Sequence, residues 1–455
     1  MSTTNLFKDF DPVSAKEWKQ KIQFDLKGAD YNETLVWESP EGIKVKPFYH
    51  SDDETKPIQV KKTSGWHIGK SIYAGNAVLA NKNGLEALEN GAESLIFVIP
   101  STDVKVEELL KDIITKGTAI YFELQFLSSA YIKDLLNFVG DAKENIYLNV
   151  DIVGNLARSG NWFYNLEKDH EELKTILSFN AKNTIGIDVS LYQNAGANMV
   201  QQLGYALAHT NEYLNEIKSN FEKPIEITFK VSVGTNYFFE IAKLRALRIL
   251  WSALAKEYGV SESCHIIAVP TRRNKTLYDY NTNMLRTTTE SMAAVLGGAN
   301  MVYNMPYDAI YHKENDFGNR IAINQLLLLK NESYFDKIDN AAEGAYYIEA
   351  LTEQLANKGL ELFKSIEKGG GFLKLLKAHT IQKKIKESAQ KEQDAFETGK
   401  AVLVGTNKFL NESDKMKDDL ELYPFVKTNA RKTLLEPIIE RRLAEDVEQN
   451  RLKDE

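Results

Sequence analysis

The chain has 455 residues, of which 43% are hydrophobic and 26% are charged, an ordinary composition for a globular protein. Its net charge of -8 provides no basic surface for nucleic acid, and its single cysteine, Cys264, excludes an internal disulfide and a site built from several cysteines. No apolar run approaches the roughly 20 residues that span a bilayer and no signal-peptide pattern opens the sequence, so we expect a cytoplasmic protein that contacts neither membrane nor nucleic acid.

Residues 1–63 are predicted to form an N-terminal arm. A helix is expected between the capping box of Ser14 and Glu17 and the stop signal at Gly28. The stretch after it is extended, rich in aromatic residues and too short to bury them by itself. The arm should therefore pack on a partner chain or on its own barrel, and the candidate contact residues are Trp18, Phe24, Trp37, Phe48 and Tyr49.

Residues 64–335 are predicted to form a (β/α)8 TIM barrel, because short β-branched runs alternate with amphipathic helical runs. The predicted strands cover residues 67–75, 94–100, 119–126, 145–153, 185–191, 225–233, 264–270 and 300–306. An open doubly wound sheet is the alternative, but no glycine-rich phosphate turn follows the first strand. We expect residues 336–427 to be a helical extension of the barrel domain and residues 428–455 to be a charged helical tail.

Several titratable residues are predicted near strand ends, where barrels carry their catalytic groups. Lys230 is either a Schiff-base lysine that points into the lumen or a lysine with a packed stem and a solvated head. Asp151 and Asp188 are general bases or, alternatively, capping and ion-pairing groups. His209 stands alone on a predicted helix, and no two of the seven histidines have the spacing of a zinc motif.

Four cations are candidate contacts for an anionic ligand or for a partner. Arg158 follows the fourth predicted strand, and the other three, Arg272, Arg273 and Lys275, follow the seventh. Arginine and lysine at the mouth of a barrel suit a phosphate or a carboxylate. A solvated loop, with the cations paired to acids such as Asp279, is the alternative.

The sequence resembles the barrel domain of the methylmalonyl-CoA mutase family along nearly its whole length. The resemblance rests on residues 41–49, 193–198, 205–208, 240–251, 283–300 and 404–409, which occur in the family's order. It implies a TIM barrel and the radical interconversion of methylmalonyl-CoA and succinyl-CoA with adenosylcobalamin.

Three departures from the catalytic members accompany this resemblance. Those members read Y-H-M-Q-E-A-G at the turn after the fifth strand, which places Leu191 at the position of their catalytic histidine. Leucine can neither donate a hydrogen bond nor change its charge. An apolar stretch, 267–270, replaces the family's polar T-H-S-Q-T-S-G segment, and residues 428–455 resemble the linker to a cobalamin domain that is absent here.

In these departures the chain resembles the small, non-catalytic subunit of heterodimeric family members. They imply that this chain has no catalytic residue and binds no cofactor, and that a large catalytic subunit carries adenosylcobalamin. A barrel completed in trans by a separate cobalamin-binding chain is the alternative. The first hypothesis predicts a lumen filled by bulky apolar side chains, whereas the second predicts an open lumen with polar walls.

Overall fold

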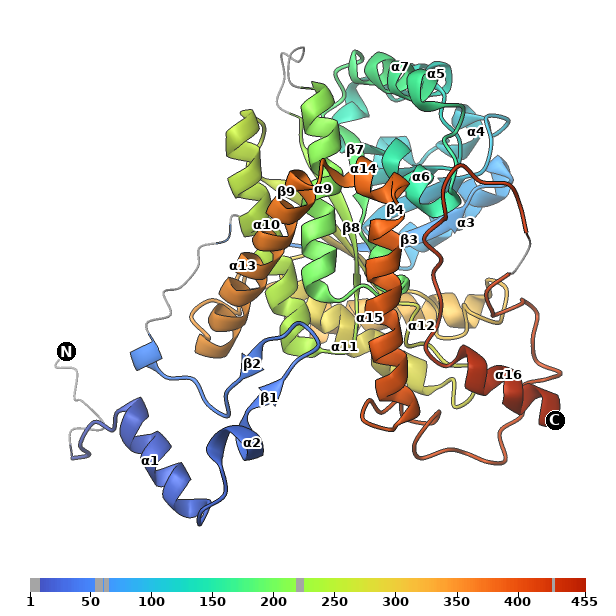
Figure 1. Cartoon of the computed structure of the whole chain (residues 1–455). Helices are drawn as coiled ribbons and strands as arrows, with labels where there is room; N and C mark the ends of the chain where they lie inside the picture. The colour runs from blue at the N-terminus through green and yellow to red at the C-terminus, as the bar shows by residue number, and fades with distance from the viewer. Residues whose placement is uncertain (1–8, 54–59, 61–64, 218–224, 428–429) are drawn as a thin grey trace.

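The computed structural model describes residues 9–53, 60, 65–217, 225–427 and 430–455 (Figure 1). Residues 1–8, 54–59 and 61–63 of the predicted arm lie outside these ranges. None of the helices in the described ranges combines the length and the apolar character that crossing a bilayer requires.

Eight parallel strands close into a barrel, in the order β10-β3-β4-β5-β6-β7-β8-β9. The strands are β3 (His67–Tyr73), β4 (Ser94–Ile99), β5 (Ala119–Leu124), β6 (Ile146–Val150), β7 (Asn183–Asp188), β8 (Ile227–Val233), β9 (Cys264–Pro270) and β10 (Met301–Tyr303). All eight predicted strands are therefore confirmed, and the fold is a TIM barrel. Every residue of β9 is buried, as expected for a parallel sheet with both faces covered.

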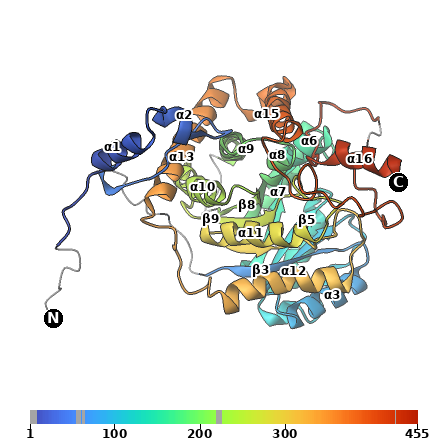
Figure 2. The same ribbon diagram turned by 90° about the horizontal axis from the view of Figure 1, so that it is seen from below.

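Helices surround the strands. They are α3 (Ala77–Glu89), α4 (Val106–Leu109), α5 (Ser129–Val139), α6 (Ile152–Ser159), α7 (Leu166–Leu177), α8 (Ser190–Asn194), α9 (Met199–Ile217), α10 (Tyr237–Tyr258), α11 (Thr282–Leu296) and α12 (Asp316–Leu327). Viewed from below, α11 and α12 lie along one side of the barrel (Figure 2). Helix α10 ends at Gly259, whose φ of 66° gives the left-handed conformation that glycine adopts without steric cost.

The N-terminal arm has two parts that differ in burial. Its helix α1 (Ala15–Asp25) begins at the predicted capping box, has no buried residue, and stands apart from the barrel in both views (Figures 1 and 2). The hairpin of β1 (Trp37–Glu38) and β2 (Lys44–Val45) packs on the chain's own barrel, where Ile43 between the strands is buried and the ring of Trp37 lies 5.8 Å from that of Phe239.

The C-terminal part is less helical than expected. Helices α13 (Tyr346–Lys368), α14 (Phe372–Lys377) and α15 (Thr380–Glu397) follow the barrel, and α13 packs against α9 and α10. From residue 398 to the start of α16 (Glu445–Asp454), the described residues form no helix and no strand beyond one isolated bridge. Residues 430–444 lie against the barrel and bury Leu435, Ile438 and Leu443, so this part of the tail packs on the barrel instead of extending away from it.

Candidate functional site

A cavity of about 690 Å³ opens at the C-terminal end of the barrel strands. Because side chains alternate along a strand, the lumen-facing residues of each strand recur at every second position. Those that line the cavity are mainly polar or charged: Ser71 on β3, Glu123 on β5, Asn149 on β6, Asp188 on β7, Thr228, Lys230 and Ser232 on β8, and Tyr303 on β10. Barrel enzymes carry their active sites at this end.

The lumen is filled on the other side of this cavity, toward the N-terminal ends of the strands. The rings of Tyr121 and Tyr147 stack with centroids 4.3 Å apart, and the Tyr121 hydroxyl lies 2.9 Å from Nε2 of His265. Burial lowers the pKa of His265 to about 3, which keeps its ring neutral. A filled lumen is thus found in the half of the barrel toward the N-terminal ends of the strands. The prediction is wrong for the half toward the C-terminal ends, where the strands present polar residues.

Ion pairs hold the charged groups of the cavity wall. Nζ of Lys230 lies 2.7 Å from Oε1 of Glu123, and an oxygen of Asp188 lies 2.6 Å from Nη2 of Arg158. Burial opposes the charge on Lys230, but the neighbouring Glu123 carboxylate outweighs it and raises the pKa of this lysine. A Schiff base requires a neutral amine, so the structure favours the interpretation of Lys230 as an ion-paired lysine.

Asp151 and His209 form a buried pair beside the cavity. The Asp151 carboxylate accepts hydrogen bonds from His209 Nε2 (2.9 Å), from the Tyr213 hydroxyl (2.6 Å) and from the backbone N–H of Gly154 at the start of α6 (2.8 Å). The ring of His209 also stacks on Phe372, with 5.3 Å between centroids. These three bonds go to Oδ1, and Oδ2 accepts a hydrogen bond from the backbone N–H of Asp188 (3.1 Å). With both oxygens engaged, Asp151 matches the capping and ion-pairing alternative better than that of a general base.

Leu191 lies in α8, directly after β7. Its side chain is 1% exposed and belongs to the main hydrophobic core, whereas Ser190 and Asn194 are the residues of α8 that line the cavity. Asn194 also joins neighbouring loops, because its Oδ1 accepts hydrogen bonds from the Thr271 hydroxyl (2.8 Å) and from the backbone N–H of Arg272 (3.0 Å). Neither Ser190 nor Asn194 is among the residues predicted from sequence, although their spacing of four places them on one face of a helix.

The four candidate cations do not lie at one site in the structure. Arg158 and Arg272 line the cavity, and the side chain of Arg272 is exposed. Arg273 is buried, and it donates hydrogen bonds to Glu392 on α15 (2.5 Å) and to the backbone carbonyl of Arg441 (2.8 Å). It therefore fastens the C-terminal part to the barrel and does not face the cavity.

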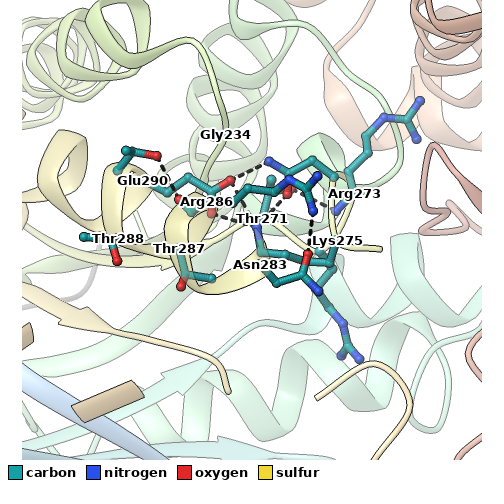
Figure 3. A network of polar contacts seen from close by, with 12 residues as sticks. Gly234, Thr271, Arg273, Lys275, Asn283, Arg286, Thr287, Thr288 and Glu290 are labelled. Carbon is teal, nitrogen blue, oxygen red and sulfur yellow. Dashed lines mark hydrogen bonds and ion pairs between the residues drawn. The ribbon is translucent and has the colours of Figure 1, made fainter. Parts of the chain in front are cut away.

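Lys275 belongs to a buried polar network behind the cavity (Figure 3). Its Nζ lies 2.8 Å from a carboxylate oxygen of Glu290 on α11, and the two side chains are 1% and 0% exposed. Asn274 donates a further hydrogen bond to the same carboxylate. Lys275 is therefore held in a buried structural ion pair with Glu290, where neither an anionic ligand nor a partner reaches it.

The cavity walls do not fit the cobalt centre that the family resemblance implies. Their residues include neither a histidine nor a cysteine to ligate a metal. Within the described ranges, no three histidine, cysteine, aspartate or glutamate side chains converge on a possible metal position. This cavity therefore offers no ligand for the cobalt of adenosylcobalamin.

Comparisons with known proteins show which family this chain is similar to. The methylmalonyl-CoA mutase family model matches residues 142–453. The methylmalonyl-CoA mutase small subunit of Porphyromonas gingivalis is 33% identical over 92% of this chain and 73% of its own length. The small subunit of Propionibacterium freudenreichii subsp. shermanii is 25% identical over 84% and 66%, and the methylmalonyl-CoA mutase of Rhizobium meliloti is 27% identical over 90% and 65%. The chain thus spans between 65% and 73% of the length of these relatives.

Proposed function

Because this chain belongs to the methylmalonyl-CoA mutase family, we propose that it is the non-catalytic small subunit of a heterodimeric mutase. The large subunit of that enzyme carries adenosylcobalamin and interconverts methylmalonyl-CoA and succinyl-CoA in the cytoplasm. The small-subunit names of two relatives support the assignment.

The observation that carries this proposal is the burial of Leu191. The family resemblance expects a histidine there, which would hold the substrate during the rearrangement. Leu191 offers no hydrogen bond or charge, and its side chain lies in the core and not in the cavity wall. Four of the charged groups that do face the cavity form two ion pairs, Lys230 with Glu123 and Arg158 with Asp188.

The test is the activity and the composition of the native complex. The chain is tagged in its own host, purified gently, and the co-purifying proteins are identified and quantified. An equimolar larger chain with bound cobalamin, and no turnover by the isolated folded small chain with added adenosylcobalamin, is the expected result. Turnover of methylmalonyl-CoA by the single chain would overturn the non-catalytic assignment.

Helix α1 is the proposed contact with the large subunit. Its aromatic side chains Trp18 and Phe24 are 50% and 79% exposed, and no residue of the helix is buried on this chain. Replacing both residues by serine should weaken co-purification of the larger chain. Val78 and Leu79 on α3 are similarly exposed, and their replacement by serine is the matched control. An equal effect of the two double variants would show that α1 is not a specific contact.

The open polar cavity favours one second candidate. A barrel completed in trans by a separate cobalamin-binding chain should have an open lumen with polar walls, and the half of this barrel toward the C-terminal ends of its strands has one. The same purification distinguishes the two candidates, because a short cobalamin-binding chain would replace the large subunit. Leu191 counts against this second candidate.

A further inference from the structure

A segment of the C-terminal part packs on the loop that follows β10, at the C-terminal end of the barrel. We define residues 411–425 as the clasp and residues 304–315 as the β10 loop. Met416 of the clasp is 1% exposed and belongs to the same small hydrophobic core as Ile310 and Tyr311 of the loop. An apolar contact therefore joins the two segments.

Backbone hydrogen bonds also hold the clasp to the β10 loop. The N–H groups of Glu421 and Leu422 both donate to the carbonyl of Tyr311, at 2.9 and 2.8 Å. In return, the N–H of Lys313 donates to the Glu421 carboxylate at 2.8 Å. Exchange of the Glu421 and Leu422 amides therefore reports whether the clasp is docked on the loop.

The ring of His312 lies between two carboxylates, one from each segment. Its Nδ1 lies 3.1 Å from Oδ2 of Asp308, on the same loop, and its Nε2 lies 3.4 Å from Oδ1 of Asp419, on the clasp. The side chain of Asp308 is 3% exposed and also accepts a hydrogen bond from Nδ2 of Asn315, whereas that of Asp419 is 53% exposed. The ring of Tyr311 packs beside the imidazole, with 4.3 Å between centroids.

A protonated ring suits both carboxylates, and a neutral ring suits one. An ionised carboxylate accepts hydrogen bonds but donates none, and a neutral imidazole has one N–H where the imidazolium has two. A neutral His312 should keep its N–H on the buried Asp308, because a buried carboxylate loses more than an exposed one when its donor is removed. Its other nitrogen then turns a lone pair toward Asp419. Burial disfavours the charge on His312, but Asp308 and Asp419 outweigh it and raise its pKa above the ordinary 6.5.

We propose that His312 is a pH-sensitive switch, which holds the clasp on the β10 loop while its ring is protonated and loosens it when the ring loses its proton. Asp308 lies on the same loop as the ring, so it is Asp419 that couples docking of the clasp to protonation. Because docking favours the protonated ring, this stabilisation is complete below about pH 6.5 and is lost as the pH rises through the raised pKa. The loop also contributes Met305 and Ala309 to the cavity wall, so the switch acts beside the cavity. The proposal goes beyond the proposed function and stands whether or not the chain pairs with a large subunit.

Hydrogen exchange of the full chain, followed by mass spectrometry, measures the switch. Protection factors of the peptide that carries Glu421 and Leu422 are compared at about pH 6 and about pH 8, after correction for the intrinsic pH dependence of exchange. In the wild type they should fall about two- to fivefold as the pH rises, the size expected for a partly exposed ion pair. Peptides of α9, which report the stability of the whole fold, should show no fall of this size.

Two single substitutions distinguish Asp419 from its neighbour in the clasp. In Asp419→Asn the fall should disappear, because the asparagine amide can donate to the neutral ring and carries no charge to attract the protonated one. The matched control is Asp418→Asn. Both aspartates are exposed, and the control removes one carboxylate from the clasp while it leaves Asp419 beside His312, so it should keep the wild-type response.

Three results overturn the proposal. Equal protection of the clasp peptide at both pH values in the wild type would show that the ring does not control docking. A fall that is unchanged in Asp419→Asn would show that another group causes it. A fall of the same size in α9 would assign the response to the whole fold and not to the clasp.

Discussion

The Lys275→Met substitution is predicted to destabilise the fold by about 3–5 kcal/mol, the usual cost of breaking a buried ion pair by removing one partner. Nζ of Lys275 lies 2.8 Å from Glu290, and neither side chain is more than 1% exposed. Methionine has a similar length and leaves no large void, so the loss would come from the charge that remains on Glu290. Asn274 alone would then face that carboxylate.

Urea unfolding at pH 7, followed by circular dichroism, measures this cost. The double variant Lys275→Met, Glu290→Gln should be more stable than Lys275→Met alone, because no uncompensated charge is left in the core. The matched surface control is Lys82→Met on α3, whose ion pair with Glu86 is exposed and should contribute about 0.5 kcal/mol or less. A loss for Lys275→Met as small as that of the control would refute the reasoning and return Lys275 to the candidate contacts.

Three further predictions concern the cavity and the turn beside it. Leu191→Ala should cost about 2–5 kcal/mol in urea unfolding, because the side chain is 1% exposed, and a loss near zero would contradict its place in the core. Burial disfavours the Asp188 carboxylate, but Lys230 and Arg158 outweigh it and hold its pKa below the ordinary 3.8. Its contribution to stability is therefore complete above about pH 4 and is lost as the pH falls further, so Asp188→Asn should flatten the fall in melting temperature between pH 5 and pH 3; an unchanged slope would contradict this. Borohydride with carbonyl compounds should leave no reduced adduct on Lys230, since its pKa is raised, and an adduct found by mass spectrometry would revive the Schiff-base interpretation.

The barrel could be predicted from sequence because its signals are local. Each strand is a short run of β-branched and aromatic residues, and each is followed by residues with helical periodicity. The capping box of Ser14 and Glu17 likewise lies within one turn of helix and is found as predicted. The extent of the C-terminal helices was overestimated, because charged residues after Glu397 suit an exposed helix as well as a loop that is bound to a neighbouring surface.

The roles of the cations could not be read from sequence, because their partners lie elsewhere in the chain. Arg273 pairs with Glu392 on α15, and Arg442 donates to the carbonyl of Lys275 and pairs with Glu448. A sequence shows a basic loop and an acidic helix but not their contact. The sequence gives only a weak signal that Lys275 is buried, namely the large apolar residues Leu277 and Tyr278 that follow it closely. Both of them are buried in the structure.

The turn at Leu191 and the open cavity are separate features of this barrel, because the Leu191 side chain lies in the core and not in the cavity wall. An apolar side chain at this turn is satisfied by packing alone, as Leu191 is in the core. The ionised groups of β5, β7 and β8 cannot be buried in the same way, since a charge removed from water needs a partner. Glu123 and Lys230 satisfy each other, and Asp188 and Glu440 both pair with Arg158. Pairing within the chain therefore stabilises the charged walls of the cavity.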